Sequence, residues 1–156
     1  MLLIIALAAL GVGYAWWTEQ IMASGTIQTG NFDVHMDNAS TAEDDPLNAA
    51  ICSLSFSDNG KIMGISVQNG YPGYSCRILF DLNNHGSIPT KVIDVHYTNG
   101  EDDFEISSFG ALSSKPLLYP AVPVSAELLV KLLPDAEPKT TYRFDLSIDI
   151  AQGNAP

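Results

Sequence analysis

The stretch from Gly64 to Tyr97 constrains the fold most, because it contains three runs of alternating apolar and polar residues separated by two strong turn sequences. In the middle run the alternate residues are apolar, as in a strand that buries one face: Cys76, Ile78, Phe80 and Leu82. Only Leu79 breaks this alternation. The turns, residues 69–73 and 83–86, contain residues that tolerate positive φ, and each is strong enough to connect a β-hairpin.

The same period of two recurs along the rest of the chain, with turn residues between the runs. The first of the three runs covers residues 63–67, and we expect further strands at residues 26–36, 52–56, 104–108, 128–132 and 142–150. Residues 37–50 are polar and lack periodicity, which predicts a surface loop, whereas residues 57–60 predict a hairpin turn. Residues 126–133 contain good helix formers, but their short length and Pro134 favour a strand. Seven or eight strands in residues 26–156 predict an all-β, jelly-roll-like β-sandwich.

An apolar segment precedes this domain. The first 17 residues carry no charged side chain, and the apolar run before Gly11 has about the length of the hydrophobic region of a signal peptide. Gly13 and Ala15 are the small residues expected before a cut at Trp16, although the basic start of a typical signal peptide is missing. Residues 1–15 are therefore a signal peptide or a retained hydrophobic segment, and retention is the one route by which we expect membrane contact.

Residues 16–25 connect this segment to the sandwich and are a candidate donor strand. Cleavage before Trp16 would leave an apolar terminus with no core of its own, which can pair with the sheet of a neighbouring molecule. The residues that we expect to make this contact are Trp16, Trp17, Ile21 and Met22.

The charge balance narrows the possible partners. The net charge is −11, from 7 Lys and Arg against 18 Asp and Glu, and no basic cluster occurs. We therefore expect no binding to nucleic acid or to an anionic membrane surface.

Two candidate covalent modifications follow from a secreted location. Cys52 and Cys76 both fall in predicted strands and form a candidate disulfide, with two buried free thiols as the alternative. Asn38 begins an Asn-Ala-Ser glycosylation sequon.

No sequence motif for catalysis stands out. The histidines, His35, His85 and His96, lack the spacing of a zinc motif, and there is no nucleophile elbow or phosphate-binding glycine loop. We expect a protein that is not an enzyme and that uses no metal or cofactor.

Several motifs occur together in one order along the chain. The N-terminal part has an apolar segment, the Trp16-Trp17 pair, and the Gly25-Thr26-Ile27 start of a strand that continues through Gly30 to Asp33. The Tyr71-Pro72-Gly73 turn, the Asn84-His85-Gly86-Ser87 turn and the closing strand from residue 142 to Asn154 follow. In this order the motifs resemble those of the secreted camelysin/TasA-type proteins. The cysteine pair and the missing basic start fit an archaeal relative of this family, such as a bundling-pilus protein.

The resemblance implies a jelly-roll subunit of an extracellular fibre, a biofilm matrix fibre or a surface pilus, that polymerises with itself head to tail by N-terminal strand donation. Two alternatives stay open. One is a pilin-like subunit that keeps residues 1–22 as a helix. The other is a camelysin-type metallopeptidase that uses His35, His85 or His96.

Overall fold

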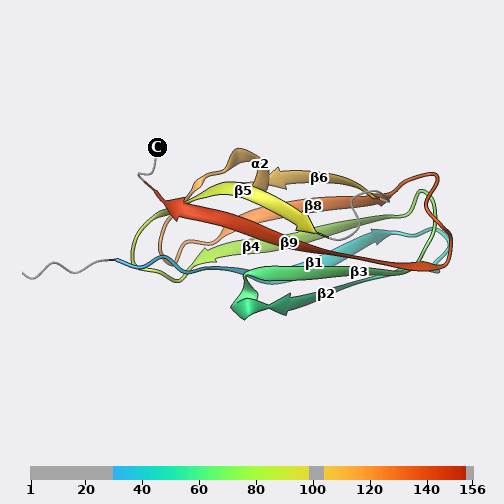
Figure 1. Cartoon of the computed structure of the whole chain (residues 1–156), viewed down its shortest axis with the longest axis horizontal. Helices are drawn as coiled ribbons and strands as arrows, with labels where there is room; N and C mark the ends of the chain where they lie inside the picture. Colours follow the sequence, from blue (N-terminus) through green and yellow to red (C-terminus); the bar gives the residue numbers. More distant parts are fainter. Residues whose placement is uncertain (1–29, 99–103, 154–156) are drawn as a thin grey trace, which may run out of the picture.

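The computed structural model describes residues 30–98 and 104–153. These residues form an elongated sandwich of two antiparallel β-sheets whose strands run along its long axis (Figure 1). In chain order the elements are β1 (Val34–Asp44), β2 (Ile51–Ser57), η1 (Asp58–Gly60), β3 (Ile62–Gly70), β4 (Ser75–Asn84), β5 (Thr90–Thr98), β6 (Phe104–Gly110), α2 (Ala111–Ser114), β7 (Leu117–Leu118), β8 (Val124–Leu132) and β9 (Thr140–Gln152).

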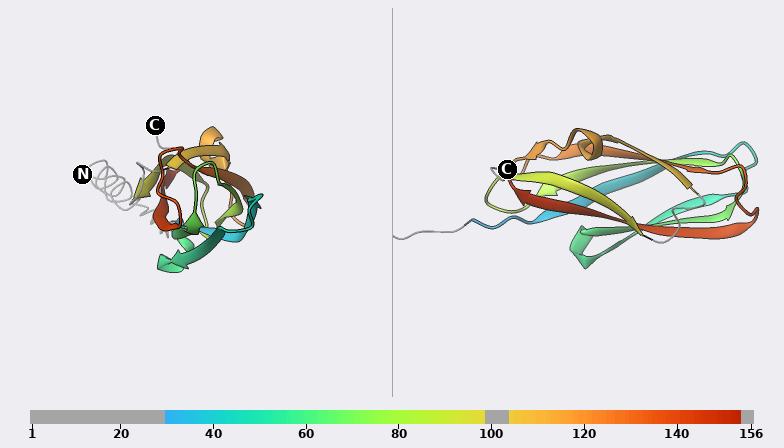
Figure 2. Two further views of the ribbon diagram at one scale, coloured as in Figure 1. Left: turned by 90° about the vertical axis from the view of Figure 1, so that its right-hand side faces the viewer. Right: turned by 45° about the horizontal axis from the view of Figure 1, so that its top comes forward.

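The two sheets have the strand orders β1-β4-β8-β6 and β2-β3-β9-β5-β7. Among the described strands, only β2 and β3 are hairpin neighbours in both sequence and space; the other consecutive strands lie in opposite sheets. The chain therefore passes repeatedly across the ends of the sandwich, and the sheets enclose one core, as the end-on view in Figure 2 shows. The predicted all-β sandwich is confirmed.

The period-two pattern decides which side chains form this core. All four alternate residues of β4 are buried, whereas Leu79, the exception to the pattern, is on the outer face with 42% of its surface exposed. The opposite sheet contributes Met63, Ile65 and Val67 from β3 and the alternate residues of β9 up to Leu146. A strand places successive side chains on opposite faces, so the alternation of apolar and polar residues in the sequence identifies the buried side chains.

The turns on either side of β4 differ from the prediction. They do not form hairpins, because β3 and β5 lie in one sheet and β4 lies in the other. At the second turn the buried Asn84 side chain donates to the carbonyls of Ile88 and Leu118 (2.8 and 3.0 Å) and accepts from the Gly86 N–H (2.9 Å). Turn residues specify a reversal of the chain, but contacts such as these specify which sheet it enters.

The prediction for the first strand and the following loop was wrong. A strand was expected at residues 26–36 and a loop at 37–50, whereas β1 spans Val34–Asp44; residues 26–29 lie outside the described part of the chain. The second half of β1 is exposed and polar, yet it pairs with β4 from Ser40 opposite Leu79 to Asp44 opposite Ser75. An edge strand is held by backbone hydrogen bonds, so it does not need an apolar face along its whole length.

Three local predictions are confirmed. Residues 57–60 connect the β2–β3 hairpin through η1, and residues 126–132 lie in strand β8 rather than in a helix. The strand expected at residues 104–108 is β6. Within the described residues, no helix is long and apolar enough to cross a membrane.

Candidate functional site

One stretch of β9 lacks a partner on one side. β9 is the longest described strand, with 13 residues, and its pairing with β3 ends where Ile62 lies opposite Ser147. Beyond that point, residues 148–152 pair with β5 alone among the described strands. Alternate backbone N–H and C=O groups of this stretch therefore point toward a position in the sheet that no described strand occupies.

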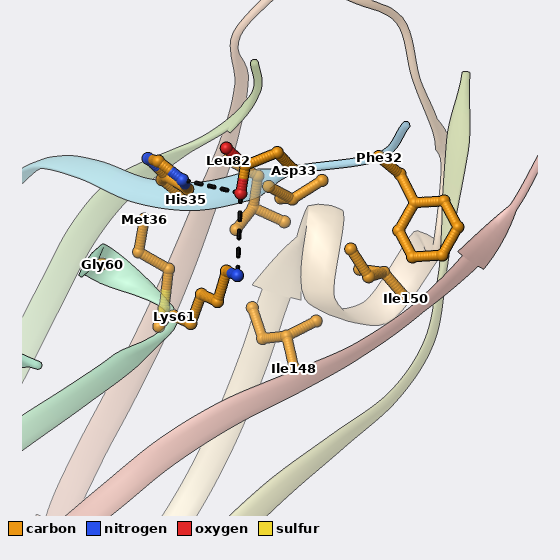
Figure 3. A pocket seen from close by; sticks show the side chains of 10 residues that line it. Phe32, Asp33, His35, Met36, Gly60, Lys61, Leu82, Ile148 and Ile150 are labelled. Atoms are coloured by element: carbon orange, nitrogen blue, oxygen red, sulfur yellow. Dashed lines mark hydrogen bonds and ion pairs between the residues drawn. The ribbon is translucent and has the colours of Figure 1, made fainter. Parts of the chain in front are cut away.

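A slot of about 230 Å³ lies beside this unpaired edge (Figure 3). Ile148 and Ile150 of β9 form one wall, and the opposite wall comes from the start of β1 and from β4. The apolar residues of that second wall are Phe32, Val34, Met36 and Leu82. Phe32 has 49% of its surface exposed, so the slot leaves a large apolar side chain in contact with water.

Two other sheet edges, those of β5 and β1, carry features that hinder strand pairing. β7 covers β5 only at Thr90 and Lys91, and just beyond them β5 has a bulge between Val92 and Asp94. There the Lys115 ammonium donates to the Ile93 carbonyl at 2.5 Å. Bulges and lysines are common means of preventing edge pairing, and β1 likewise has a bulge between Asp37 and Ser40. Residues 148–152 of β9 carry no lysine, and the extra residue of the bulge opposite them, Ile93, belongs to β5.

The chain leading into β1 is held away from this unpaired edge. The N–H groups of His85 and Ser87 donate to the carbonyls of Asp33 and Asn31 at 2.7 and 2.9 Å. These bonds extend the β1 side of the sandwich, and the described chain begins at the same end as the C-terminus of β9 (Figure 1). The described chain therefore enters the sandwich at the end where the slot lies.

Charged groups lie at one end of the slot. Lys61, the residue just before β3, places its Nζ 3.7 Å from Asp33 Oδ1, so this pair joins the two sheets across the slot (Figure 3). The same carboxylate oxygen is 2.9 Å from His35 Nε2. The hydrogen bond with His35 lowers the pKa of Asp33 below its ordinary value, and Lys61 adds to this effect.

Two of the three histidines lie together, and one of them, His35, lines the slot. The rings of His35 and His85 are 4.7 Å apart, and His85 Nε2 lies 3.4 Å from Asp37 Oδ2. Asn83 donates to the same Asp37 oxygen at 3.0 Å, and this hydrogen bond lowers the pKa of Asp37. His96 is elsewhere, on β5, where a hydrogen bond with Asp149 of β9 (2.9 Å) raises the pKa of His96. The described residues contain no cluster of three or more His, Cys, Asp or Glu that could hold a metal.

The two cysteines come from different sheets and meet in the core. Cys52 lies on β2 and Cys76 on β4; both are buried, and both are free thiols in this structure. The neighbouring Cys52 thiol and burial together raise the pKa of Cys76 well above its usual range. The shared burial that the alternation predicted is present, and the disulfide stays a prediction.

The remaining predicted site residues divide into two groups. Asn38 is exposed, but it belongs to the bulge of β1 rather than to a loop, and its amide donates to Asp81 at 3.1 Å. Its glycosylation stays a prediction. The candidate donor residues Trp16, Trp17, Ile21 and Met22 lie outside the described residues.

The sequence reading missed the slot residues Lys61, Ile148 and Ile150 as parts of a site. One signal could have indicated Ile148 and Ile150. The last alternating run, residues 142–150, is longer than the run around residues 63–67, so a strand formed by the shorter run cannot pair with the whole of the longer one.

No family model, curated protein or solved structure matches this chain. The resemblance to camelysin/TasA-type proteins therefore stays a hypothesis based on its motifs.

Proposed function

We propose that this chain is a structural subunit of an extracellular or cell-surface filament, which polymerises when residues 16–25 of one subunit enter the slot of the next. The observation that carries this proposal is the unpaired edge of β9, residues 148–152, beside an apolar slot. An extended peptide that adds to a sheet edge gains main-chain hydrogen bonds, and pockets for its alternate side chains provide specificity.

The N-terminal segment has the chemistry that such a slot would accept. Trp17 and Ile21 fall on one face of an extended strand, and burying a large apolar side chain contributes roughly 1.5–3 kcal/mol. Several such contacts and a row of backbone hydrogen bonds can exceed the entropic cost of ordering the strand. Because the donated strand and the slot are different surfaces, their contact is heterologous and yields an open polymer rather than a closed dimer.

Deletion of residues 16–24 from the mature protein tests this function. We expect the shortened chain to stay folded and monomeric and to form no filaments in electron micrographs, because the sandwich keeps its core but loses the inserted strand. Far-ultraviolet circular dichroism and a thermal melt establish that the shortened chain is folded.

A synthetic peptide of residues 16–25 provides a second measurement. Added to the shortened chain, it is expected to slow hydrogen exchange at the amides of residues 148–152 on β9, while a scrambled peptide of equal composition leaves them unchanged. Filaments that persist after the deletion would show that the subunits contact each other elsewhere.

A further inference from the structure

One end of the slot is charged and the rest is apolar, so an incoming strand can be selected by the position of its own charged residue. Lys61 is the one lysine or arginine among the residues that line the slot, and its ammonium extends across the slot toward Asp33. Both side chains are partly exposed, so their pairing contributes little to stability. Asp33 also keeps its bond to His35 at 2.9 Å, which leaves it a partner if Lys61 moves away.

The N-terminal segment offers one group that can replace Asp33. Glu19 is the only charged side chain in the first 32 residues of the chain. In an extended strand it shares a face with Trp17 and Ile21, each two residues, or about 6.6 Å, away from it. Whether the strand enters parallel or antiparallel to β9, the next side chain on the face that carries Glu19 is therefore apolar.

Lys61 is placed to meet this carboxylate. It immediately precedes Ile62, where the pairing of β3 with β9 stops opposite Ser147. A strand that fills the vacant position beside residues 148–152 would thus lie in line with β3 and end or begin next to Lys61. One strand face could then put Glu19 against the ammonium, with Trp17 or Ile21 against Ile148 and Ile150.

We infer that Lys61 is the specificity-determining residue of the slot: it forms an ion pair with Asp33 in the free subunit and exchanges this partner for Glu19 of the incoming strand of a second copy. This inference rests on the proposed function. A buried carboxylate without a partner is costly, so the contact rejects strands with a misplaced charge and sets the register of the correct strand. The ammonium of Lys61 also allows a chain with a net charge of −11 to bind a segment that carries the carboxylate of Glu19.

Reciprocal charge reversal tests the inference in the full chain with its own N-terminal segment. We expect Lys61→Glu and Glu19→Lys each to raise the protein concentration needed for filament formation by about tenfold or more, because each creates a like-charge pair in the slot. The double variant, in which the charges are exchanged, should restore assembly to within about threefold of the native chain, since the pair is re-formed with opposite polarity.

Lys131→Glu is the matched control. Lys131 is an exposed lysine on β8, away from the slot, and its reversal changes the net charge by the same two units as Lys61→Glu. It should assemble at nearly the native concentration. A thermal melt of each variant shows whether the sandwich is intact, and Glu19→Gln supplies a variant that alters no residue of the sandwich.

The outcomes separate this inference from the function on which it rests. Normal assembly of folded Lys61→Glu, or of Glu19→Gln, overturns the inference and leaves strand insertion possible. Failure of the double variant while Lys131→Glu assembles overturns the pairing of Glu19 with Lys61. Filaments formed without residues 16–24 overturn the proposed function itself.

Discussion

Gly110, between β6 and α2, has a backbone conformation that a residue with a side chain would adopt only with strain. Its φ of 64° and ψ of −128° lie in a region that is essentially restricted to glycine. A Cβ at this position would also lie 2.8 Å from the carbonyl oxygen of Ser125, which belongs to β8 and cannot move away alone. We expect Gly110→Ala to lower the free energy of unfolding by at least about 2 kcal/mol.

Gly73→Ala is the control for this prediction. Gly73 also has a positive φ, 87°, but a Cβ there would meet nothing within 4 Å. Its replacement should cost only the backbone strain, about 1 kcal/mol. Urea denaturation of the two variants measures both values, and equal losses would show that the contact with Ser125 has no effect.

Individual residues also show what can be read from sequence. The outward position of Leu79 follows directly from alternation, because the strand period assigns each residue to a face. The buried Asn84 does not follow from it, since its role depends on carbonyls of residues 88 and 118 that only the folded chain brings together.

Among the elements, the two cysteine-bearing strands lie in different sheets. Cys52 lies on the edge strand β2 and Cys76 on the inner strand β4, so a disulfide between them would tie that edge to the opposite sheet. We expect this bond to form under oxidising conditions and to stabilise the sandwich by roughly 3 kcal/mol. Intact mass before and after reduction, with alkylation of the unreduced protein, detects the bond.

The variant Cys52→Ser with Cys76→Ser serves as the comparison. Under oxidising conditions it should melt at a lower temperature than the native chain, and under reducing conditions the difference should become much smaller. Two thiols that react fully with an alkylating agent in denatured but unreduced protein would contradict the disulfide.

The lengths of elements were harder to predict than their existence. The strands at β4, β8 and β9 alternate over most of their length and were placed correctly. The second half of β1 has polar side chains, so its sequence resembles a loop, and only its backbone pairing with β4 makes it a strand. Pairing between strands 30 or more residues apart leaves no local signal in the sequence.

At the scale of the whole molecule, the sandwich was predictable and the slot was not. Apolar alternation with frequent turns is enough to indicate two packed sheets. The slot arises because β9 extends past the start of β3 while β1 faces the vacant position, which depends on strand order and register together. Its charged end is equally non-local, since Lys61 and Asp33 come from opposite sheets.

The acidity of the whole molecule makes salt a test of assembly. Copies of a chain with a net charge of −11 repel one another, and raising the salt concentration from about 0.01 M to about 0.1 M shortens the screening length from about 30 Å to about 10 Å. We expect filament formation, followed by light scattering, to become faster over this range. The Lys131→Glu control, more negative by two units, should need more salt for the same rate. Slower assembly at the higher salt concentration would instead show that screening weakens an attractive ion pair between molecules more than it weakens their overall repulsion.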